Sequence, residues 1–431
     1  MAMLYIRDKA TRKIKYVEEA FSSLVWTERF QEAGEFVLEI PLKDANVEMY
    51  NIGDYISMDE SDESMVINSI DIDDEVEDPL LKIEGRSLVS LLDRRVDQPG
   101  YFNKYANVYS KGVGTNSWVR HSGGCPLYKG TYSQLMHDIF TDNALDPIVE
   151  GMYFDHVTDP ETMESEWVLK MYTNKAPERK MLHFSFQNLV PSTDDPELEI
   201  QTSEVNDLLT LFTRFAKKAA KGFRVIFDDN DEFVLQAYSG KDRRTAQNLL
   251  SPVVFDPIMD NIMYVNYHND DYDYKTIGFG YSDEYKVTEG LFGTMFVDDG
   301  SAWGTPVDGN PGDIDRREVS LDMSSKSSTE DTTEDEGTGE ETTTYLSPVD
   351  PLFEDGNFVK IQTSEGSVDP LAQYQFERDY FLGDLVDLNN ANGIFMEAII
   401  DEVVRSYDSD GIIVTPNFKN LEEYDDGEED S

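Results

Sequence analysis

The sequence predicts an α+β protein that is mainly β, with two β-barrel domains on either side of an α+β middle domain. Three observations lead to this fold class: a hairpin pattern that occurs twice, many short alternating segments bounded by turn residues, and one strongly periodic helix between them. The chain of 431 residues is long enough for about three domains, each with its own core. Hydrophobic residues make up 39% and aromatic residues 12%, which excludes a disordered chain.

A hairpin pattern that starts with Gly-Asp occurs near both ends of the chain. Each copy has a short alternating strand, a turn of small and acidic residues, and a second apolar strand. The copies match at a constant offset of 330 residues, which joins Gly53, Asp54, Ile56, Ile70 and Asp71 to Gly383, Asp384, Val386, Ile400 and Asp401. A solenoid has a period of only tens of residues. We therefore expect two similar β-barrels, with a chance match of two Gly-Asp strand starts as the alternative.

Residues 1–95 are expected to form the first barrel and a helix that plugs or braces it. The alternating segments and the first hairpin supply five or more strands, as a small barrel needs. Residues 85–95 contain leucines at helical spacing after Ser87, a suitable N-cap. The Arg94-Arg95 pair at the end of this helix is unusual in so acidic a chain. It either compensates neighbouring carboxylates or forms a candidate interface.

Residues 96–250 are predicted to hold inserted loops and the α+β middle domain. The clearest helix of the chain covers 203–220, where apolar residues recur with helical spacing and Thr202 or Ser203 would cap the first turn. Two strands joined by an acidic turn follow over 223–238. A helix packed on such strands is typical of an α+β domain.

Residues 251–420 are predicted to form the second barrel region, and 421–431 an acidic tail. Within this region, 324–344 are rich in threonine, serine and acidic residues and contain almost no apolar residue. We expect this segment to be a disordered loop.

The sequence contains no recognisable catalytic, cofactor or metal motif. A His-Glu-x-x-His helix, a P-loop and a Gly-x-Ser-x-Gly turn are all absent. The single Cys125 excludes an internal disulfide and a Cys-based zinc site, and the five histidines share no ligand spacing. Asp408-Ser-Asp-Gly411 resembles the start of a calcium loop, but Ile412 follows where an oxygen ligand is needed, so a hairpin turn is favoured. We expect no enzyme and no cofactor; a hydrolase with an unrecognised carboxylate site is the alternative.

The net charge of −51, from 87 acidic and 36 basic residues, is extreme. It disfavours DNA binding through backbone neutralisation and suits a surface that DNA passes without sticking. Because the charge is spread along the chain, we expect a protein that stays soluble in high salt, as in a halophilic virus. The first residues lack an apolar signal core, and no run of about 18 apolar residues occurs. We expect neither a signal peptide nor a membrane segment.

Several segments, in order, resemble the baseplate hub proteins, also called tail-associated or tail-tip proteins, of long-tailed phages or related archaeal tailed viruses. These segments are 22–30, 34–41, 85–95, 238–244, 254–257, 316–319, 380–388 and 415–418. The resemblance implies two tube-like β-barrels in each chain and a homotrimeric ring with pseudo-sixfold symmetry. The family usually has a helical segment before the last barrel, where this chain has the acidic segment 324–344.

The resemblance also implies a structural role in the virion tail baseplate after assembly in the host cytoplasm. Such a hub joins the tail tube to tip or fibre proteins. The expected partners are two further copies of the chain, a distal tail or tail-tube protein, the tape measure protein and a tail fibre or tip protein, with DNA only in transit during genome ejection. A receptor- or carbohydrate-binding tail protein is the alternative, suggested by the aromatic loops around 101–118.

Overall fold

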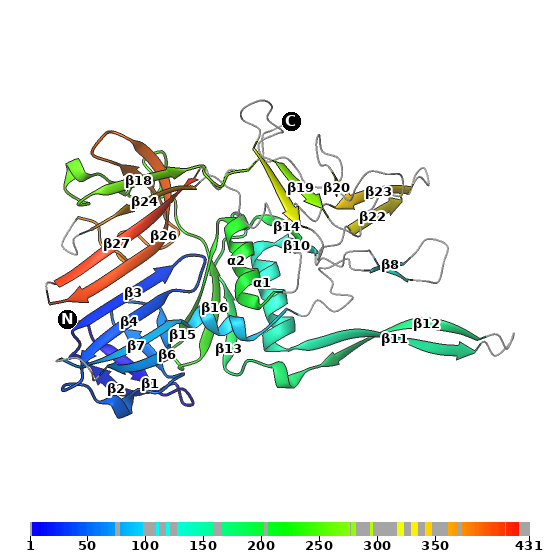
Figure 1. The fold of residues 1–431 in the computed structure, drawn as a ribbon, viewed down its shortest axis with the longest axis horizontal. Coiled ribbons are helices and arrows are strands. Elements are labelled where there is room, and N and C mark those ends of the chain that lie inside the picture. Colours follow the sequence, from blue (N-terminus) through cyan, green and yellow to red (C-terminus); the bar gives the residue numbers. More distant parts are fainter. Residues whose placement is uncertain are drawn as a thin grey trace.

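A 13-stranded sheet contains strands from both ends of the chain (Figure 1). The computed structural model describes residues 2–73, 78–97, 109–111, 118–120, 127–158, 165–201, 206–275, 277–281, 294–295, 317–322, 329–334, 341–346, 361–368, 373–409 and 411–421. The N-terminal part of the sheet consists of β1 (Leu4–Arg7), β2 (Ile14–Glu18), β3 (Ser23–Arg29), β4 (Glu35–Pro41), β5 (Tyr55–Met58), β6 (Ser64–Asp73) and β7 (Leu80–Ser87). The C-terminal part consists of β17 (Val254–Phe255), β18 (Val265–Asp270), β24 (Ile361–Gly366), β25 (Leu385–Asn389), β26 (Phe395–Asp408) and β27 (Gly411–Asn420).

These two parts, which we call the first and second modules, share one strand order. The first module runs β3-β4-β7-β6-β5-β1-β2, and the second runs β18-β24-β27-β26-β25-β17. The last comparable strands differ in direction, since β1 is antiparallel to β5 whereas β17 is parallel to β25. The arrangement confirms the predicted fold class, a mainly β protein with two similar β domains.

Each module has its own hydrophobic core. Alternation along β4 turns Phe36, Leu38 and Ile40 inward, as expected for a strand with one buried face. The core of the first module also includes Leu4, Ile6, Leu24, Trp26, Ile56, Met58, Met65, Ile67, Leu81 and Ile83. The core of the second module includes Val253, Phe255, Ile262, Val386, Leu388, Met396, Ile399, Ile400, Val403 and Phe418.

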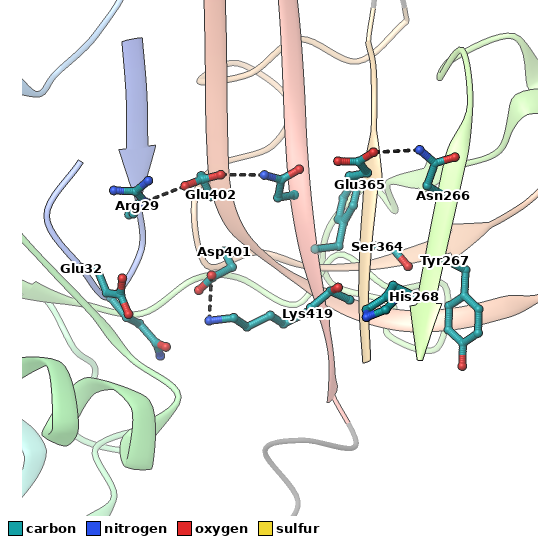
Figure 2. A pocket seen from close by; sticks show the side chains of 14 residues that line it. Arg29, Glu32, Asn266, Tyr267, His268, Ser364, Glu365, Asp401, Glu402 and Lys419 are labelled. Atoms are coloured by element: carbon teal, nitrogen blue, oxygen red, sulfur yellow. Dashed lines mark hydrogen bonds and ion pairs between the residues drawn. The ribbon is translucent and has the colours of Figure 1, made fainter. Parts of the chain in front are cut away.

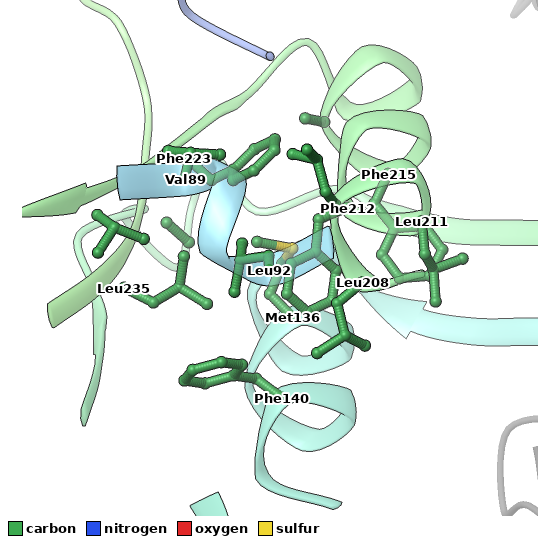
Figure 3. Close-up of a cluster of buried hydrophobic side chains, with 14 of the residues drawn as sticks. Val89, Leu92, Met136, Phe140, Leu208, Leu211, Phe212, Phe215, Phe223 and Leu235 are labelled. Atoms are coloured by element: carbon green, nitrogen blue, oxygen red, sulfur yellow. The ribbon is translucent and has the colours of Figure 1, made fainter. Parts of the chain in front are cut away.

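A third core lies in the middle region, which packs beside both modules (Figures 1 and 3). Its elements are α1 (Tyr132–Phe140), α2 (Leu208–Ala219), the strands β10 (Leu127–Thr131), β13 (Phe184–Asn188), β14 (Glu197–Gln201), β15 (Gly222–Phe227) and β16 (Phe233–Tyr238), and the short 3-10 helix η2 (Leu88–Arg94). Leu88, Leu91 and Leu92 of η2 pack into this core with the side chains of α1 and α2. The bracing helix predicted from the sequence therefore connects the first module to the middle region.

The main helix of the middle region starts later than the sequence suggested. α2 begins at Leu208, and its N-cap is Asp207, whose carboxylate accepts hydrogen bonds from the backbone nitrogen and hydroxyl of Thr210 at 2.9 and 2.8 Å. The prediction of Thr202 or Ser203 as the cap is therefore wrong. Aspartate is as good an N-cap as serine. The apolar periodicity alone therefore could not show at which of these candidate caps the helix begins.

The acidic segment 324–344 is not wholly disordered, which corrects the prediction. β22 (Thr329–Glu334) and β23 (Glu341–Leu346) form an antiparallel hairpin in which Thr332 pairs with Thr343. Threonine is β-branched and favours extended strands, so a low apolar content did not exclude a hairpin. The remaining residues of this segment and residues 422–431 of the predicted tail lie outside the described residues.

Further strands extend from the middle region and the second half of the chain (Figure 1). They are β8 (Tyr109–Lys111), β9 (Trp118–Arg120), β11 (Ile148–Thr158), β12 (Ser165–Lys175), β19 (Ile277–Tyr281), β20 (Thr294–Met295) and β21 (Glu318–Asp322). Short helical turns are η1 (Val47–Met49), η3 (Thr141–Leu145), η4 (Pro177–Arg179) and η5 (Pro257–Met259). The long hairpin of β11 and β12 projects away from the helices. The predicted domain boundaries stay predictions.

Candidate functional site at the junction of the two modules

The two Gly-Asp turns have the same conformation. Gly53 and Gly383 have φ values of 88° and 84°, in the left-handed region that favours glycine. Asp54 and Asp384, which follow them, are buried. Each aspartate accepts hydrogen bonds from two backbone N–H groups and from one cationic side chain. For Asp54 the backbone donors are Lys9 and Asn51 and the side chain is that of Lys15. For Asp384 the backbone donors are Lys241 and Phe381 and the side chain is that of Arg243. Each turn therefore ties the start of a strand, β5 or β25, to a segment distant in sequence, 9–15 or 241–243.

The second strand of the repeat is shifted from the predicted register. Tyr55 pairs with Val66 and Leu385 pairs with Ile399, so the first strands correspond at an offset of 330 and the second strands at 333. The turn of the second copy thus holds three more residues. The predicted matches that are wrong are those of Ile70 with Ile400 and Asp71 with Asp401.

The corrected register is supported by two equivalent β-bulges. Gly53 donates its backbone N–H to the carbonyl of Ile67 at 2.9 Å, and Gly383 donates to that of Ile400 at 2.8 Å. The next residue is a bulge in both strands, between Ile67 and Ser69 in β6 and between Ile400 and Glu402 in β26. A bulge increases the local twist, so both strands turn at the same point.

Beyond its bulge, β26 no longer pairs with β25; it keeps β27 of its own module on one side and pairs with β3 of the first module on the other. The antiparallel pairs run from Glu402 opposite Arg29 to Tyr407 opposite Leu24. The modules also exchange core side chains across this junction. Phe30, at the end of β3, is buried in the core of the second module, and Tyr407 is buried in that of the first. The junction is therefore built like the interior of one domain.

A charged cluster lies under the junction. Arg405 of β26 is 5% exposed, and its guanidinium lies 3.0 Å from Glu377 and 3.5 Å from Glu28 of β3. The same side chain donates to the backbone carbonyl of Glu60, in the turn between β5 and β6. One cation therefore contacts both modules.

Two glutamates of this cluster favour the protonated form. Burial raises the pKa of Glu63 well above its ordinary value, and the negative charge of Glu28 adds to the shift. Burial also raises the pKa of Glu377 to about 7, with a further upward contribution from the charge of Glu28, while the nearby Arg405 acts in the opposite direction. The junction thus holds a carboxyl group, that of Glu377, whose charge changes near neutral pH.

A polar cavity of about 600 Å³ opens beside the junction (Figure 2). Two ion pairs cross its wall: Arg29 with Glu402 at 2.6 Å and Lys419 with Asp401 at 2.8 Å. Tyr267 and His268 of β18 lie at the far side of the cavity. More of the lining is polar than apolar, whereas pockets for small molecules are lined predominantly by hydrophobic side chains.

Residues 3–418 match the model of a protein family described as siphovirus ReqiPepy6 Gp37-like protein. The chain belongs to this Gp37-like family. Membership confirms the predicted resemblance to tail-associated proteins of long-tailed phages and identifies the chain as a structural protein of the virion tail. None of the curated protein sequences matches the chain.

A solved tail protein shares the fold of this Gp37-like protein, and further tail proteins align with nearly the whole chain. The 43 kDa tail protein of prophage MuSo2 from Shewanella oneidensis is 14% identical, with a TM-score of 0.50 over 98% of this chain and 100% of that one. The tail protein from Neisseria meningitidis MC58 is 10% identical, with a TM-score of 0.46 over 99% of both chains. The prophage tail protein gp18 from Listeria monocytogenes EGD-e is 11% identical, with a TM-score of 0.41 over 97% of this chain and 94% of that one.

The Arg94-Arg95 pair lies at the end of η2, away from the module junction. Arg94 is exposed, whereas Arg95 is partly buried and donates from Nε to the carbonyl of Arg179 at 2.7 Å. Together with Glu178 these arginines line a recess of about 300 Å³. The pair therefore forms a basic surface on an acidic Gp37-like protein, and its role as an interface stays a prediction.

Other sequence candidates have ordinary structural roles. His137 bonds to the adjacent Asp138 and His183 bonds to Glu232, at 2.9 and 2.8 Å. Gly411 donates to Asp408 at 3.2 Å within the turn that joins β26 to β27. In the part of the chain that the structure describes, no three histidine, cysteine, aspartate or glutamate side chains form a group that could hold a metal ion. Nor does any helix there reach the length and apolarity of a bilayer span.

Proposed function

We propose that this Gp37-like protein is a structural baseplate hub, a homotrimeric ring that joins the tail tube to tip or fibre proteins. The presence of two modules of one strand order in a single sheet carries this proposal. Three such chains would place six similar modules around an axis. A ring of this kind can contact a sixfold partner on one side and a threefold partner on the other.

The charge of the chain supports a channel through which DNA and the tape measure protein pass. With a net charge of −51, the electrostatic term that normally drives non-specific DNA binding has the opposite sign. We propose that the genome slides through an acidic channel without a binding site, and that the protein needs neither catalysis nor a cofactor. Arg94 and Arg95 are the candidate contact to another tail protein, and assembly would take place in the host cytoplasm.

The mass of the purified chain in solution, followed by averaged electron images, tests the ring. We expect a mass of three chains and ring-shaped particles with six similar lobes. Antibody labelling of virions should place the chain at the tip of the tail tube. A monomer at every concentration, or labelling spread over fibres together with binding to host cells, would instead support the receptor-binding alternative.

A further inference from the structure

One end of the 13-stranded sheet is the exposed strand β18. Among the described residues, β18 pairs only with β24, and its four central residues, 266–269, are exposed. An edge strand of this kind presents unpaired backbone N–H and C=O groups to any strand that can align with it.

The second half of β6 has a similar free side. Residues 64–66 of β6 pair with β5, but within the described chain residues 69–73 pair only with β7. These residues follow the bulge at Asn68, where β6 turns away from β5.

The strands with a free side are equivalent to the strands that join the modules: β18 occupies the place of β3, and β6 occupies the place of β26. In the first module, residues that lie opposite each other on neighbouring strands connect Ile67 with Gly85, Phe36 and Trp26 in turn. In the second module, the equivalent series connects Ile400 with Phe418, Ser364 and Tyr267. Trp26 of β3 therefore corresponds to Tyr267 of β18. Residues 402–406 of β26, which pair with β3, correspond to residues 69–73.

We propose that β6 of one copy pairs with β18 of a second copy, antiparallel and in the register of the β26 and β3 junction. The inference rests on the proposed ring, because it names the surface through which copies would join. The same type of contact would then occur within each chain and between chains. Since the two surfaces differ, association is head to tail and can close into a ring.

The side chains that this register brings together fit one another. The pair of Arg405 and Trp26 at the junction corresponds to Ile72 of one copy opposite Tyr267 of the next. In the single chain Ile72 is 47% exposed and Tyr267 is 36% exposed. The neighbouring pair, Val404 opposite Thr27, corresponds to Asp71 opposite His268, where a carboxylate faces an imidazole. The contact would cover two apolar side chains that are otherwise in water.

The charge of the chain sets a condition on this pairing. Copies that each carry a net charge of −51 repel one another at low ionic strength. At physiological ionic strength, salt largely screens the repulsion between exposed charges that are more than about 8 Å apart. The backbone hydrogen bonds and the apolar contact are not weakened in this way. Association should therefore strengthen with salt, unlike an interface held together by ion pairs.

Cysteine cross-linking tests the register. Directly opposite residues of antiparallel strands have Cα atoms about 4.5–5.5 Å apart, within the range of a disulfide. The full chain would carry Ile72→Cys and Tyr267→Cys with Cys125→Ser as background, and would be oxidised in high salt. We expect covalent dimers and trimers on a non-reducing gel, at about tenfold the yield of the control pair Asp71→Cys with Tyr267→Cys, whose side chains would face opposite sides of the sheet.

Equal yields from the two pairs, or only monomers from both, would overturn the register. Amide exchange on the unmodified chain gives a second measurement that does not depend on the variants. Residues 69–73 and 265–270 should exchange more slowly at high protein concentration, and unchanged exchange in both segments would overturn the pairing. If antibodies label the tail but cross-linking and slower exchange are not seen, the hub function is retained and only the contact between β6 and β18 is rejected. If the cross-links form but the antibodies do not label the tail, the contact is retained and the hub function is rejected.

Discussion

Arg29 on β3 and Glu402 on β26 form an ion pair across the two modules, with 2.6 Å between Nε and Oε2. The two residues lie directly opposite each other at the first pair of the junction. Glu402 is held from its other side by the amide of Asn417 at 2.6 Å, and Arg29 also donates to the carbonyl of Ala33 at 2.9 Å. The pair therefore sits in a fixed hydrogen-bonded frame and links segments 373 residues apart.

Replacing this arginine should weaken the junction measurably. We expect Arg29→Met to lower the free energy of unfolding by about 1–2 kcal/mol, because Glu402 loses a partner in a half-buried site. The matched control is Arg86→Met, since Arg86 and Asp93 form an exposed pair that should contribute less than about 0.5 kcal/mol. Urea unfolding of both variants gives the comparison, and equal losses would contradict a special role for the junction pair.

The two repeated glycines should differ in their tolerance of a methyl group. Both have positive φ, so alanine costs about 1 kcal/mol at either position. At Gly383 an added Cβ would also lie 2.2 Å from Cε2 of Phe30, whereas at Gly53 its nearest neighbour is Cδ of Lys9 at 3.4 Å. We expect Gly383→Ala to destabilise the protein by at least about 1 kcal/mol more than Gly53→Ala. Thermal unfolding of the two variants measures the difference, and a smaller loss at Gly383 would show that Phe30 can move aside.

Removing the central cation of the charged cluster should be severe. Arg405→Met leaves the buried Glu28 and the partly buried Glu377 without their shared partner, which costs about 3–5 kcal/mol. Adding Glu377→Gln should restore part of the stability, because it removes one of the unpaired charges. A double variant no more stable than Arg405→Met would mean that lost packing, not charge, causes the damage.

The same cluster makes stability depend on pH. Because the folded-state pKa of Glu377 is raised from 4.5 to about 7, the folded chain holds more protons than the unfolded chain between these values. The free energy of unfolding should therefore fall as pH rises from 4.5 to 7, by up to about 3 kcal/mol from this group. Glu28, Asp62 and Arg405 are the charged groups that influence it.

Glu377→Gln should flatten this part of the pH profile, measured by urea unfolding between pH 5 and 8. The control Glu19→Gln removes an exposed carboxylate of the same type and should keep the slope of the unmodified chain. A profile that stays equally steep in Glu377→Gln would assign the pH dependence to Glu63, whose pKa is also raised, or to the general negative charge of the protein.

The sequence was informative where structure depends on neighbouring residues. A glycine with positive φ followed by a capping aspartate is a local requirement, so Gly53-Asp54 and Gly383-Asp384 could be matched without coordinates. The pattern failed beyond the turn, where three extra residues shift the second strand. Apolar strands look alike after any such shift, and only the pairing with the first strand fixes the register.

By itself, the sequence determined a mainly β chain with a duplicated strand start, its extreme negative charge, and its likeness to phage tail proteins. Only the tertiary structure decided that β26 crosses to β3, that Phe30 and Tyr407 exchange cores, and that Arg405 holds three segments together. The physical reason is distance along the chain. Contacts between residues hundreds of positions apart depend on how whole modules pack, and no local pattern of residues encodes that packing.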